Sequence, residues 1–282
     1  MRSPSLVGRA HLLTALRHHW PEYLMEAWGI AMILVSAGLF ASLLEHPGLP
    51  LRALVPDPTA RTVLLGVWVG LTIIGLVYSP WGQQSGAHFN PAVTVSFLRL
   101  GKVARTDAAW YVLAQFSGGT LAVLLMAAAL GEVFTAPPVR YIVTVPGHAG
   151  LSGAFAAEFA IAFAVMAAIL RLMNSARWSR FTGLAIGGLI ALAIPLAAPI
   201  SGMSINPART FASAFAGGVW TGGWLYFVAP VLGMLSAVEA YRRLGGPTVR
   251  MCAKLDHPLH KRCIHCGHEP PPRGAVGSEE TP

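Results

Sequence analysis

Two stretches of this sequence share one pattern and decide its fold: Ser85-Gly-Ala-His-Phe-Asn-Pro-Ala-Val-Thr94 and Ser201-Gly-Met-Ser-Ile-Asn-Pro-Ala-Arg-Thr210. Six of the ten positions are identical between them. Asparagine is a preferred helix N-cap, and proline fits the first helical position because its missing N–H has no partner there. Each stretch therefore predicts the start of a short helix. The two triplets that form these starts are Asn90, Pro91, Ala92 and Asn206, Pro207, Ala208.

The composition around these stretches is that of a membrane protein. Of 282 residues, 54% are hydrophobic and only 11% are charged, whereas a soluble domain carries about 25% charged residues. The net charge of +8 comes from Lys and Arg at the ends of apolar segments and in the tail, so it forms no basic stripe. This distribution excludes nucleic-acid binding. The membrane region also contains no nucleophile–base set or phosphate loop, so we expect no enzymatic activity.

Six mostly apolar segments are long enough to span a bilayer, which takes about 20 helical residues. They predict an all-α membrane protein. The segments are Tyr23–Leu44, Thr62–Tyr78, Ala108–Leu130, Leu151–Leu170, Phe181–Ala198 and Val219–Tyr241.

The orientation follows from the Lys and Arg counts of alternate loops, since cytoplasmic loops carry the excess. The N-terminal segment, Ser79–Thr106, Arg171–Arg180 and the residues after Tyr241 hold 3, 3, 3 and 7. The opposite side holds Arg52, Arg140 and Arg209, with Arg61 at a boundary. Both termini should therefore be cytoplasmic, and we expect the protein in the plasma or cell inner membrane, surrounded by lipid.

The two Asn-Pro-Ala stretches follow the second and fifth spans, on opposite sides of the membrane. Each is followed by an apolar run too short to span. The chain thus predicts two inverted repeats, each with three spans and one re-entrant half-helix, over residues 22–130 and 151–243. Residues 1–21 are interpreted as a cytoplasmic N-terminal segment and 244–282 as a cytoplasmic tail. Glu26 and Glu158, each in the first span of its half, strengthen the repeat.

Two half-helices that enter from opposite faces would meet near the midplane with their N-termini together. Their dipoles place partial positive charge there, and the asparagine amides offer hydrogen-bond donors. Water or a small hydroxyl compound can accept these bonds, whereas a cation is repelled and a donor-fixed water cannot relay a proton. The prediction is a passive channel for water and small neutral solutes that excludes ions and protons.

From about residue 22 to 243 the chain resembles the aquaporin, or major intrinsic protein, family. The resemblance lies in the two triplets with their flanks, with Gln115, Gly118-Gly119, Pro230 and Gly233 in matching places. It implies a homotetramer with one pore per subunit. It also implies that Arg209, directly after the second triplet, is the arginine of a selectivity filter.

The other filter positions depart from those of water-selective relatives. Ile194 stands where these carry a histidine, Met203 takes the position near Arg209, and the second-span position falls on Gly70 or Val69. The pore constriction that these filter residues form should be wider and more apolar than that of a water-selective relative. In this it resembles nodulin-type members that pass boric acid. Against glycerol specialisation, Thr210 replaces an aspartate, and Tyr226-Phe227 resembles water-type members. Water is the first expectation. A channel mainly for glycerol, boric acid, ammonia or similar uncharged solutes is the alternative.

Three polar residues within or beside the predicted spans, Glu26, Glu158 and His88, need an interpretation. Glu26 and Glu158 could couple protons in a transporter, but their symmetric placement favours carboxylates that bind loop backbone N–H groups. His88 is interpreted as a structural donor beside the first triplet. A non-conducting scaffold is a further alternative, although it would need neither Arg209 nor the asparagines.

The tail carries a group of residues of the types that bind zinc, although a flexible basic tail with unbound thiols is an equal alternative. No other cofactor is expected. Residues Glu269–Pro282, rich in Pro, Gly and Glu, are expected to be disordered. The candidate ligands are Cys252, Cys263, Cys266, His257 and His260.

Overall fold

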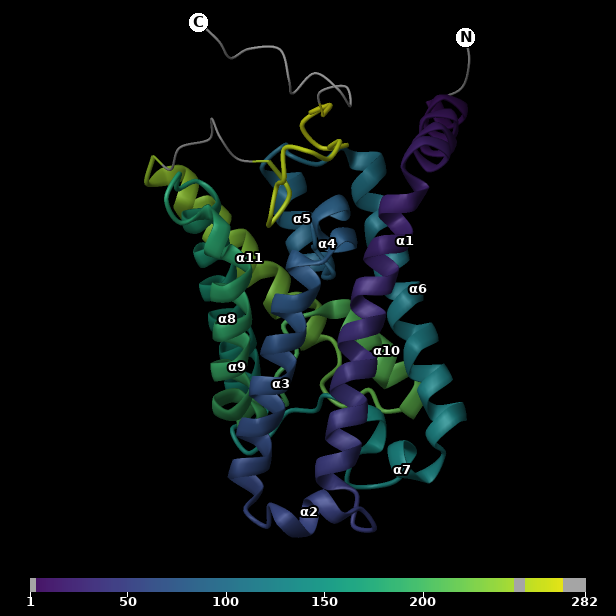
Figure 1. Ribbon diagram of the computed structural model, residues 1–282, viewed down its shortest axis with the longest axis vertical. Helices are drawn as coiled ribbons and strands as arrows, with labels where there is room; N and C mark the ends of the chain where they lie inside the picture. The colour runs from purple at the N-terminus through teal and green to yellow at the C-terminus, as the bar shows by residue number, and fades with distance from the viewer. Residues whose placement is uncertain (1–3, 246–251, 271–282) are drawn as a thin grey trace, which may run out of the picture.

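The structure is a computed structural model that describes residues 4–245 and 252–270, and every regular element in these ranges is helical (Figure 1). Two half-helices begin at the Asn-Pro-Ala triplets: α5 (Pro91–Arg99) and α10 (Pro207–Gly217). The six long helices are α1 (Pro4–Glu45), α3 (Pro58–Tyr78), α6 (Arg105–Leu130), α8 (Gly150–Met173), α9 (Thr182–Ser201) and α11 (Leu225–Arg243). The short helices are α2 (Pro50–Leu54), α4 (Pro80–Ser85), α7 (Glu132–Thr135), η1 (Arg140–Ile142) and η2 (Ser179–Phe181).

Each predicted span overlaps one long helix, and the starts of two helices differ from the prediction by more than four residues. Helix α1 begins at Pro4 instead of Tyr23, so residues 4–21 extend the first span as helix; apolar patterning could not detect this because the stretch is rich in Arg and His. Helix α11 begins at Leu225 instead of Val219, because glycines with positive φ, including Gly222, occupy the preceding turn.

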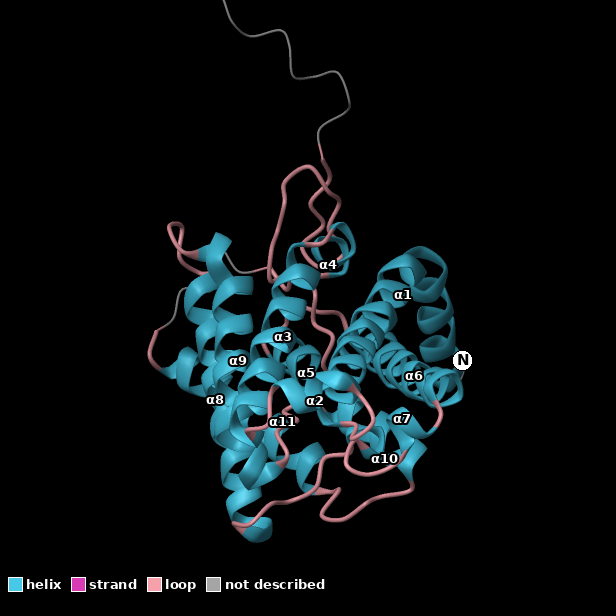
Figure 2. Ribbon diagram, turned by 60° about the horizontal axis from the view of Figure 1, so that its bottom comes forward, coloured by secondary structure: helices cyan, strands magenta, loops and turns pink. Residues whose placement is uncertain are grey.

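Within the described ranges, five helices are long and apolar enough to cross a membrane: α1, α3, α6, α8 and α9. Helix α11 has 19 residues, and its last turns carry Glu239, Arg242 and Arg243. It lies along α8, opposite the pair formed by α1 and α6 (Figure 2). The sixth predicted span is therefore a long helix of the same bundle with a charged end.

Close helix contacts are made at glycines and repeat between the two halves. A Cβ on Gly118 of α6 would lie 2.4 Å from the carbonyl oxygen of Ala27 in α1. The equivalent Gly233 of α11 would place one 2.4 Å from the carbonyl oxygen of Phe159 in α8. Small residues let helix backbones approach this closely in membranes. The paired helices α1–α6 and α8–α11 form the two related walls of the bundle.

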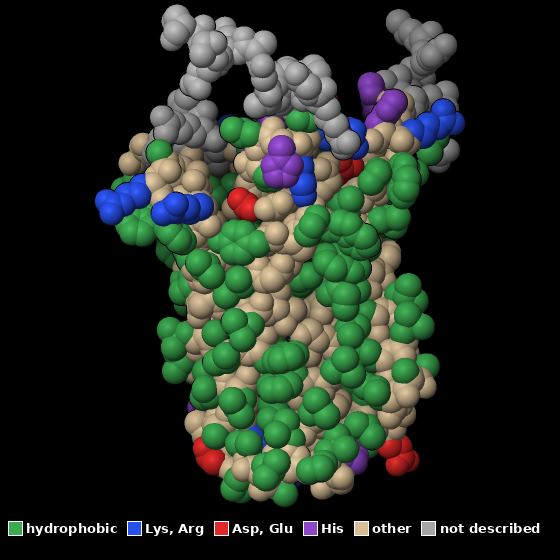
Figure 3. Space-filling model, viewed as in Figure 1, with side chains coloured by type: hydrophobic (Ala, Val, Ile, Leu, Met, Phe, Trp, Pro, Cys, Tyr) green, Lys and Arg blue, Asp and Glu red, His purple; other side chains and the backbone are tan. Residues whose placement is uncertain are grey.

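The half-helices α5 and α10 enter the bundle from opposite ends and meet inside it (Figure 1). The start of α1 and residues 252–270 lie at the same end, called the tail end here; α2 and α7 lie at the far end (Figure 1). The surface between the ends is largely hydrophobic, and charged side chains gather toward the two ends (Figure 3). Large exposed apolar side chains such as Leu121, Leu125 and Leu196 belong to this surface. The protein is an integral, multi-pass membrane protein.

Candidate pore

The two Asn-Pro-Ala triplets meet through a reciprocal pair of hydrogen bonds. The Asn90 amide nitrogen donates to the carbonyl oxygen of Ile205 at 2.8 Å, and the Asn206 amide nitrogen donates to that of Phe89 at 2.8 Å. The side-chain oxygen of each asparagine accepts from its own helix, at the backbone N–H of Ala92 and of Ala208. Each amide has two N–H donors. One therefore remains for the cavity that both side chains line.

A buried carboxylate stands behind each triplet and accepts the backbone N–H groups of the preceding loop. Glu26 of α1 accepts from the N–H groups of His88 at 3.0 Å and Phe89 at 2.6 Å. Glu158 of α8 accepts from Ser204 at 2.9 Å and Ile205 at 2.6 Å.

Side-chain donors complete both arrangements. The Ser85 hydroxyl donates to Glu26 and the Ser201 hydroxyl to Glu158, each at 2.7 Å. Gln115 adds a fourth bond to Glu26 at 2.8 Å. Both carboxylates are fully buried. The four donors to Glu26 and the three donors to Glu158 compensate for the loss of hydration.

The loops that these carboxylates hold adopt the same unusual backbone. Ala87 and Phe89 in the first loop, and Met203 and Ile205 in the second, have φ between 46° and 58°. Non-glycine residues rarely adopt this region, and the strain persists only where surrounding contacts determine it. The Glu26 and Glu158 bonds are those contacts.

A cavity of about 440 Å³ runs through the molecule past both triplets. Its lining includes Thr62 in the first turn of α3 and Val77 in the last turn. The cavity therefore follows the whole length of this helix. Its lining is mostly aliphatic, with Asn90, Asn206 and Arg209 as the polar groups that stand out.

The predicted filter residues converge on this cavity from four segments. Val69 of α3, Ile194 of α9, Met203 of the second loop and Arg209 of α10 all line it. Gly70 faces α9 instead, since a Cβ there would lie 2.5 Å from the carbonyl oxygen of Gly187. Of the two alternatives for the second span, Val69 is therefore the one in the cavity wall.

Arg209 is oriented by a residue that the sequence did not reveal. Its guanidinium donates to the Thr144 hydroxyl at 3.2 Å, and Thr144 also pairs with Thr210 at 3.0 Å. Thr144 lies in the loop between α7 and α8, and the neighbouring Val143 lines the cavity. No motif marks this loop, so only folding brings it to Arg209.

Tyr226 lies away from the cavity wall. Its hydroxyl donates to the carbonyl oxygen of Ser201 at 2.6 Å, as the Tyr111 hydroxyl donates to that of Ser85 at 2.7 Å. Both tyrosines brace a loop of the inverted repeat. Tyr226 therefore has a structural role in the second loop.

His88 joins the first loop to the tail. Its Nε2 donates to the carbonyl oxygen of Ala253 at 2.7 Å, and its Nδ1 lies 3.1 Å from the Thr94 hydroxyl. Its ring stacks on Phe97 and on His265. Burial lowers the pKa of His265 to about 4, so that ring is neutral near pH 7. His265 Nε2 donates to the carbonyl oxygen of Ser85 at 3.1 Å. Both histidines therefore donate hydrogen bonds between the channel body and the tail.

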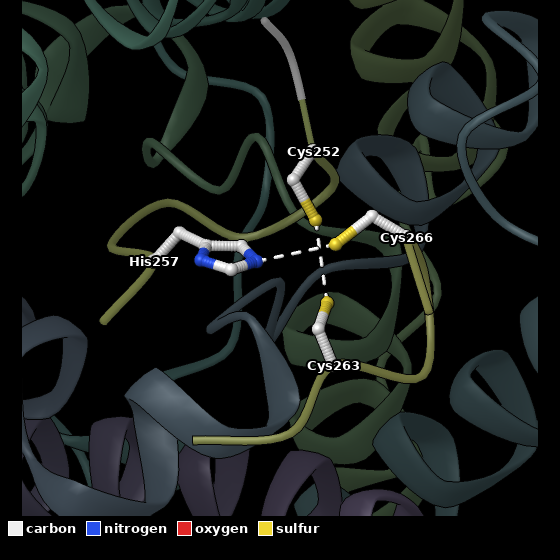
Figure 4. A group of neighbouring side chains, drawn as sticks. All are labelled: Cys252, His257, Cys263 and Cys266. Carbon is white, nitrogen blue, oxygen red and sulfur yellow. Dashed lines mark hydrogen bonds between the residues drawn. The ribbon is translucent and has the colours of Figure 1, made fainter. Parts of the chain in front are cut away.

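Four of the five predicted metal ligands come together at the tail end. The ligand atoms of Cys252, His257, Cys263 and Cys266 lie within 4.8 Å of one another (Figure 4). His260 is exposed and does not belong to this group. Residues 271–282, which include most of the segment expected to be disordered, lie outside the described residues.

The fold and site define a class of protein: a helical membrane protein with an inverted repeat, whose half-helices meet in a continuous cavity. The major intrinsic protein family model matches residues 18–241. The chain belongs to this family of channels.

Individual relatives agree with the family match. Aquaporin NIP1-2 of Arabidopsis thaliana is 36% identical over 62% of this chain, and the chain spans 60% of that protein. Nodulin-26 of Glycine max is 31% identical over 85% of this chain and 80% of its own length. Among solved structures, the aquaglyceroporin from Plasmodium falciparum has a TM-score of 0.64 at 18% identity, covering 80% of this chain and 96% of that one. That likeness supports the fold alone.

Proposed function

We propose that the protein is a passive channel for water and small neutral solutes. The observation that carries this is the cavity lined by Asn90, Asn206 and Arg209. The N-termini of α5 and α10 meet there, so their partial positive charge adds to that of the guanidinium. A cation meets a positive centre with few acceptors, whereas a neutral hydroxyl compound can accept bonds from the free amide protons.

The same geometry supports a second group of solutes besides water. Val69, Ile194 and Met203, which line the same cavity as Arg209, have apolar side chains. If Arg209 is the only polar side chain of the filter, water is held there by few hydrogen bonds. The apolar side chains also leave space for an uncharged compound larger than water, such as glycerol or boric acid. The similarity to a protein named Nodulin-26 fits this alternative. Water remains the first proposal.

Proteoliposomes with the full chain test both solutes by stopped-flow light scattering. Water conduction predicts fast shrinkage in an impermeant osmolyte with low activation energy and no dependence on a proton or sodium gradient. The alternative adds reswelling in glycerol or boric acid. A gradient-dependent flux would instead identify an ion-coupled transporter, and flux equal to that of empty vesicles would exclude conduction.

A matched pair of variants connects the flux to the cavity. Val69→Trp should fill the cavity and reduce flux to the level of empty vesicles, because Val69 lies in its wall. Val67→Trp adds the same ring to the same helix on the surface, where the residue is 46% exposed. Val67→Trp should conduct like the wild type. Equal loss in both variants would contradict the proposed path.

A further inference from the structure

The tail residues Cys252, His257, Cys263 and Cys266 have the chemistry and the spacing of a zinc site (Figure 4). Tetrahedral zinc has Zn–S bonds of about 2.3 Å and Zn–N bonds of about 2.0–2.1 Å, so neighbouring ligand atoms lie about 3.4–3.8 Å apart. Here the Cys252 and Cys263 sulfurs are 3.4 Å apart, and His257 Nε2 lies 3.3 Å from the Cys266 sulfur. All four ligand atoms lie within 4.8 Å of one another, so small shifts would bring them to the tetrahedral separations. Three sulfurs and one imidazole favour zinc over magnesium or calcium, which prefer oxygen ligands.

The surroundings of the four residues also suit a metal. All three cysteines are free, and a separation of 3.4 Å is far longer than the about 2.05 Å of a disulfide. Zinc with three thiolates has a net charge of −1, and the ammonium of Lys254 is buried beside the site. A hollow of about 690 Å³ is lined by Cys252, Cys266 and His257, which gives an ion a way in.

The segment that carries these ligands lies directly on the first loop of the channel body. The Leu255 N–H donates to the carbonyl oxygen of Gly86 at 3.1 Å, and a Cβ on Gly86 would lie 2.9 Å from the carbonyl oxygen of Ala253. Arg262 pairs with the buried Glu22 at 3.0 Å. The tail is therefore seated on the channel body by backbone and side-chain contacts.

Leu255 connects this seat to the cavity. It is 5% exposed and lines the same cavity as Val77 in the last turn of α3. It is preceded in the chain by Ala253 and Lys254, which are also buried. Leu255 lies between two of the candidate zinc ligands, Cys252 and His257. This segment thus forms part of the wall at the tail end of the cavity.

We propose that Cys252, His257, Cys263 and Cys266 bind one zinc ion, and that the bound ion holds Leu255 across the tail-end mouth of the cavity. The second part rests on the proposed channel function, whereas the first does not. Metal binding would cross-link residues 252–266, which contain few apolar side chains to keep them folded otherwise. Loss of the metal should therefore release the segment and widen the mouth.

The metal site is tested on the full chain, purified without chelators, by its zinc content. We expect about one zinc per chain, lost by about tenfold in Cys263→Ser and in Cys266→Ser, since tetrahedral sites need all four ligands. Cobalt(II) in place of zinc should give the thiolate charge-transfer absorption of a cysteine site. His260→Ala is the matched control, because this histidine is close in sequence but outside the group; it should keep its zinc. Absence of zinc in the wild type, equal loss in His260→Ala, or a Cys252–Cys263 disulfide in the isolated protein would overturn the site.

The release of the tail is measured by trypsin cleavage after Lys254, which is 2% exposed. Removing zinc with a chelator should speed this cleavage about tenfold or more, because local opening becomes the favoured state. Adding zinc back should slow it again in the wild type and not in Cys263→Ser. Cleavage that is independent of zinc would overturn the holding role.

Water flux in proteoliposomes then tests closure. Chelator on both sides of the membrane should raise the flux about threefold or more in the wild type and leave Cys263→Ser, already released, unchanged. Zinc binding with an unchanged flux would overturn the closure and leave the site. Absence of flux with and without chelator would overturn the channel function, while the zinc content and the cleavage assay would still decide the metal site.

Discussion

At the scale of single residues, Glu26 and Glu158 illustrate what a buried charge can be used for in a membrane protein. Each accepts bonds from two backbone N–H groups and at least one side chain. A carboxylate occupied in this way is an anchor, because protonation would cost several of its bonds. This argues against the proton-coupled transporter that the two residues also suggest.

Glu158→Gln should destabilise the protein. One accepting oxygen becomes an N–H₂ group that faces donors at Ser204 or Ile205, and a buried unsatisfied donor costs about 1–3 kcal/mol. The unfolding midpoint in detergent should fall, and flux per chain should fall with it. Glu132→Gln on the exposed first turn of α7 is the control and should unfold like the wild type. Equal midpoints for all three proteins would contradict the anchoring role.

Ile194→His should narrow the proposed solute range. The imidazole adds a polar group to the wall of the cavity that Arg209 also lines, and it replaces an apolar side chain. We expect boric acid or glycerol uptake to fall about tenfold relative to water flux, since pore diameter and lining donors set selectivity. Ile194→Val, which keeps the wall apolar, should retain the wild-type ratio. A ratio that does not change in Ile194→His would place the filter elsewhere.

At the scale of elements, the half-helices depend on capping and the long helices on small residues. Asn90 and Asn206 start α5 and α10 and also tie each helix to the opposite loop. The glycines of α3 and α9 allow these helices to touch at their backbones: Gly70 and Gly187 approach each other's carbonyl groups. The close contact between helices α3 and α9 therefore depends on a few glycine positions where a larger side chain would not fit.

Gly70→Ala and Gly75→Ala should have opposite effects on stability although they lie on the same helix. A methyl group on Gly70 would lie 2.5 Å from the carbonyl oxygen of Gly187, so α3 and α9 would have to separate. A methyl group on Gly75 meets nothing within 4 Å, and alanine favours a helix interior by about 0.5–1 kcal/mol over glycine. Thermal unfolding in detergent should therefore show a lower midpoint for Gly70→Ala and an unchanged or higher one for Gly75→Ala. A lower midpoint for both would contradict the packing argument.

At the scale of the whole molecule, the tail packs on one end of the inverted repeat, where Leu255 lines the cavity. The start of α1 and residues 252–270 lie at the same end (Figure 1). Loops rich in Lys and Arg alternate with loops that have few. Cytoplasmic loops carry the excess of Lys and Arg, so the tail end is the end that the charge counts predict to face the cytoplasm.

Both termini should therefore be accessible from the cytoplasmic side of the membrane. An epitope tag at either end should be digested by protease in inside-out vesicles and protected in sealed right-side-out vesicles. A tag in the loop between α1 and α3, which holds α2, should behave in the opposite way. Protection of one terminal tag together with digestion of the other would contradict the predicted topology.

The sequence by itself determined the spans, the repeat and the two half-helices. Span length, helix caps and charge distribution are local properties, and the bilayer allows few ways to satisfy a buried backbone. The close correspondence of Thr62–Tyr78 with α3 shows how far this reaches. The prediction of the first span missed residues 4–21, because this part of α1 contains several Arg and His residues and no continuous apolar stretch.

Only the tertiary structure decided which side chains share the cavity and where the tail lies. It placed Val69 and not Gly70 in the wall, brought Thr144 to Arg209, and removed His260 from the cysteine group. It also placed Leu255 in the wall of the cavity. These are contacts between segments far apart in the chain, and they depend on helix rotation and close packing, which no local pattern of residues specifies.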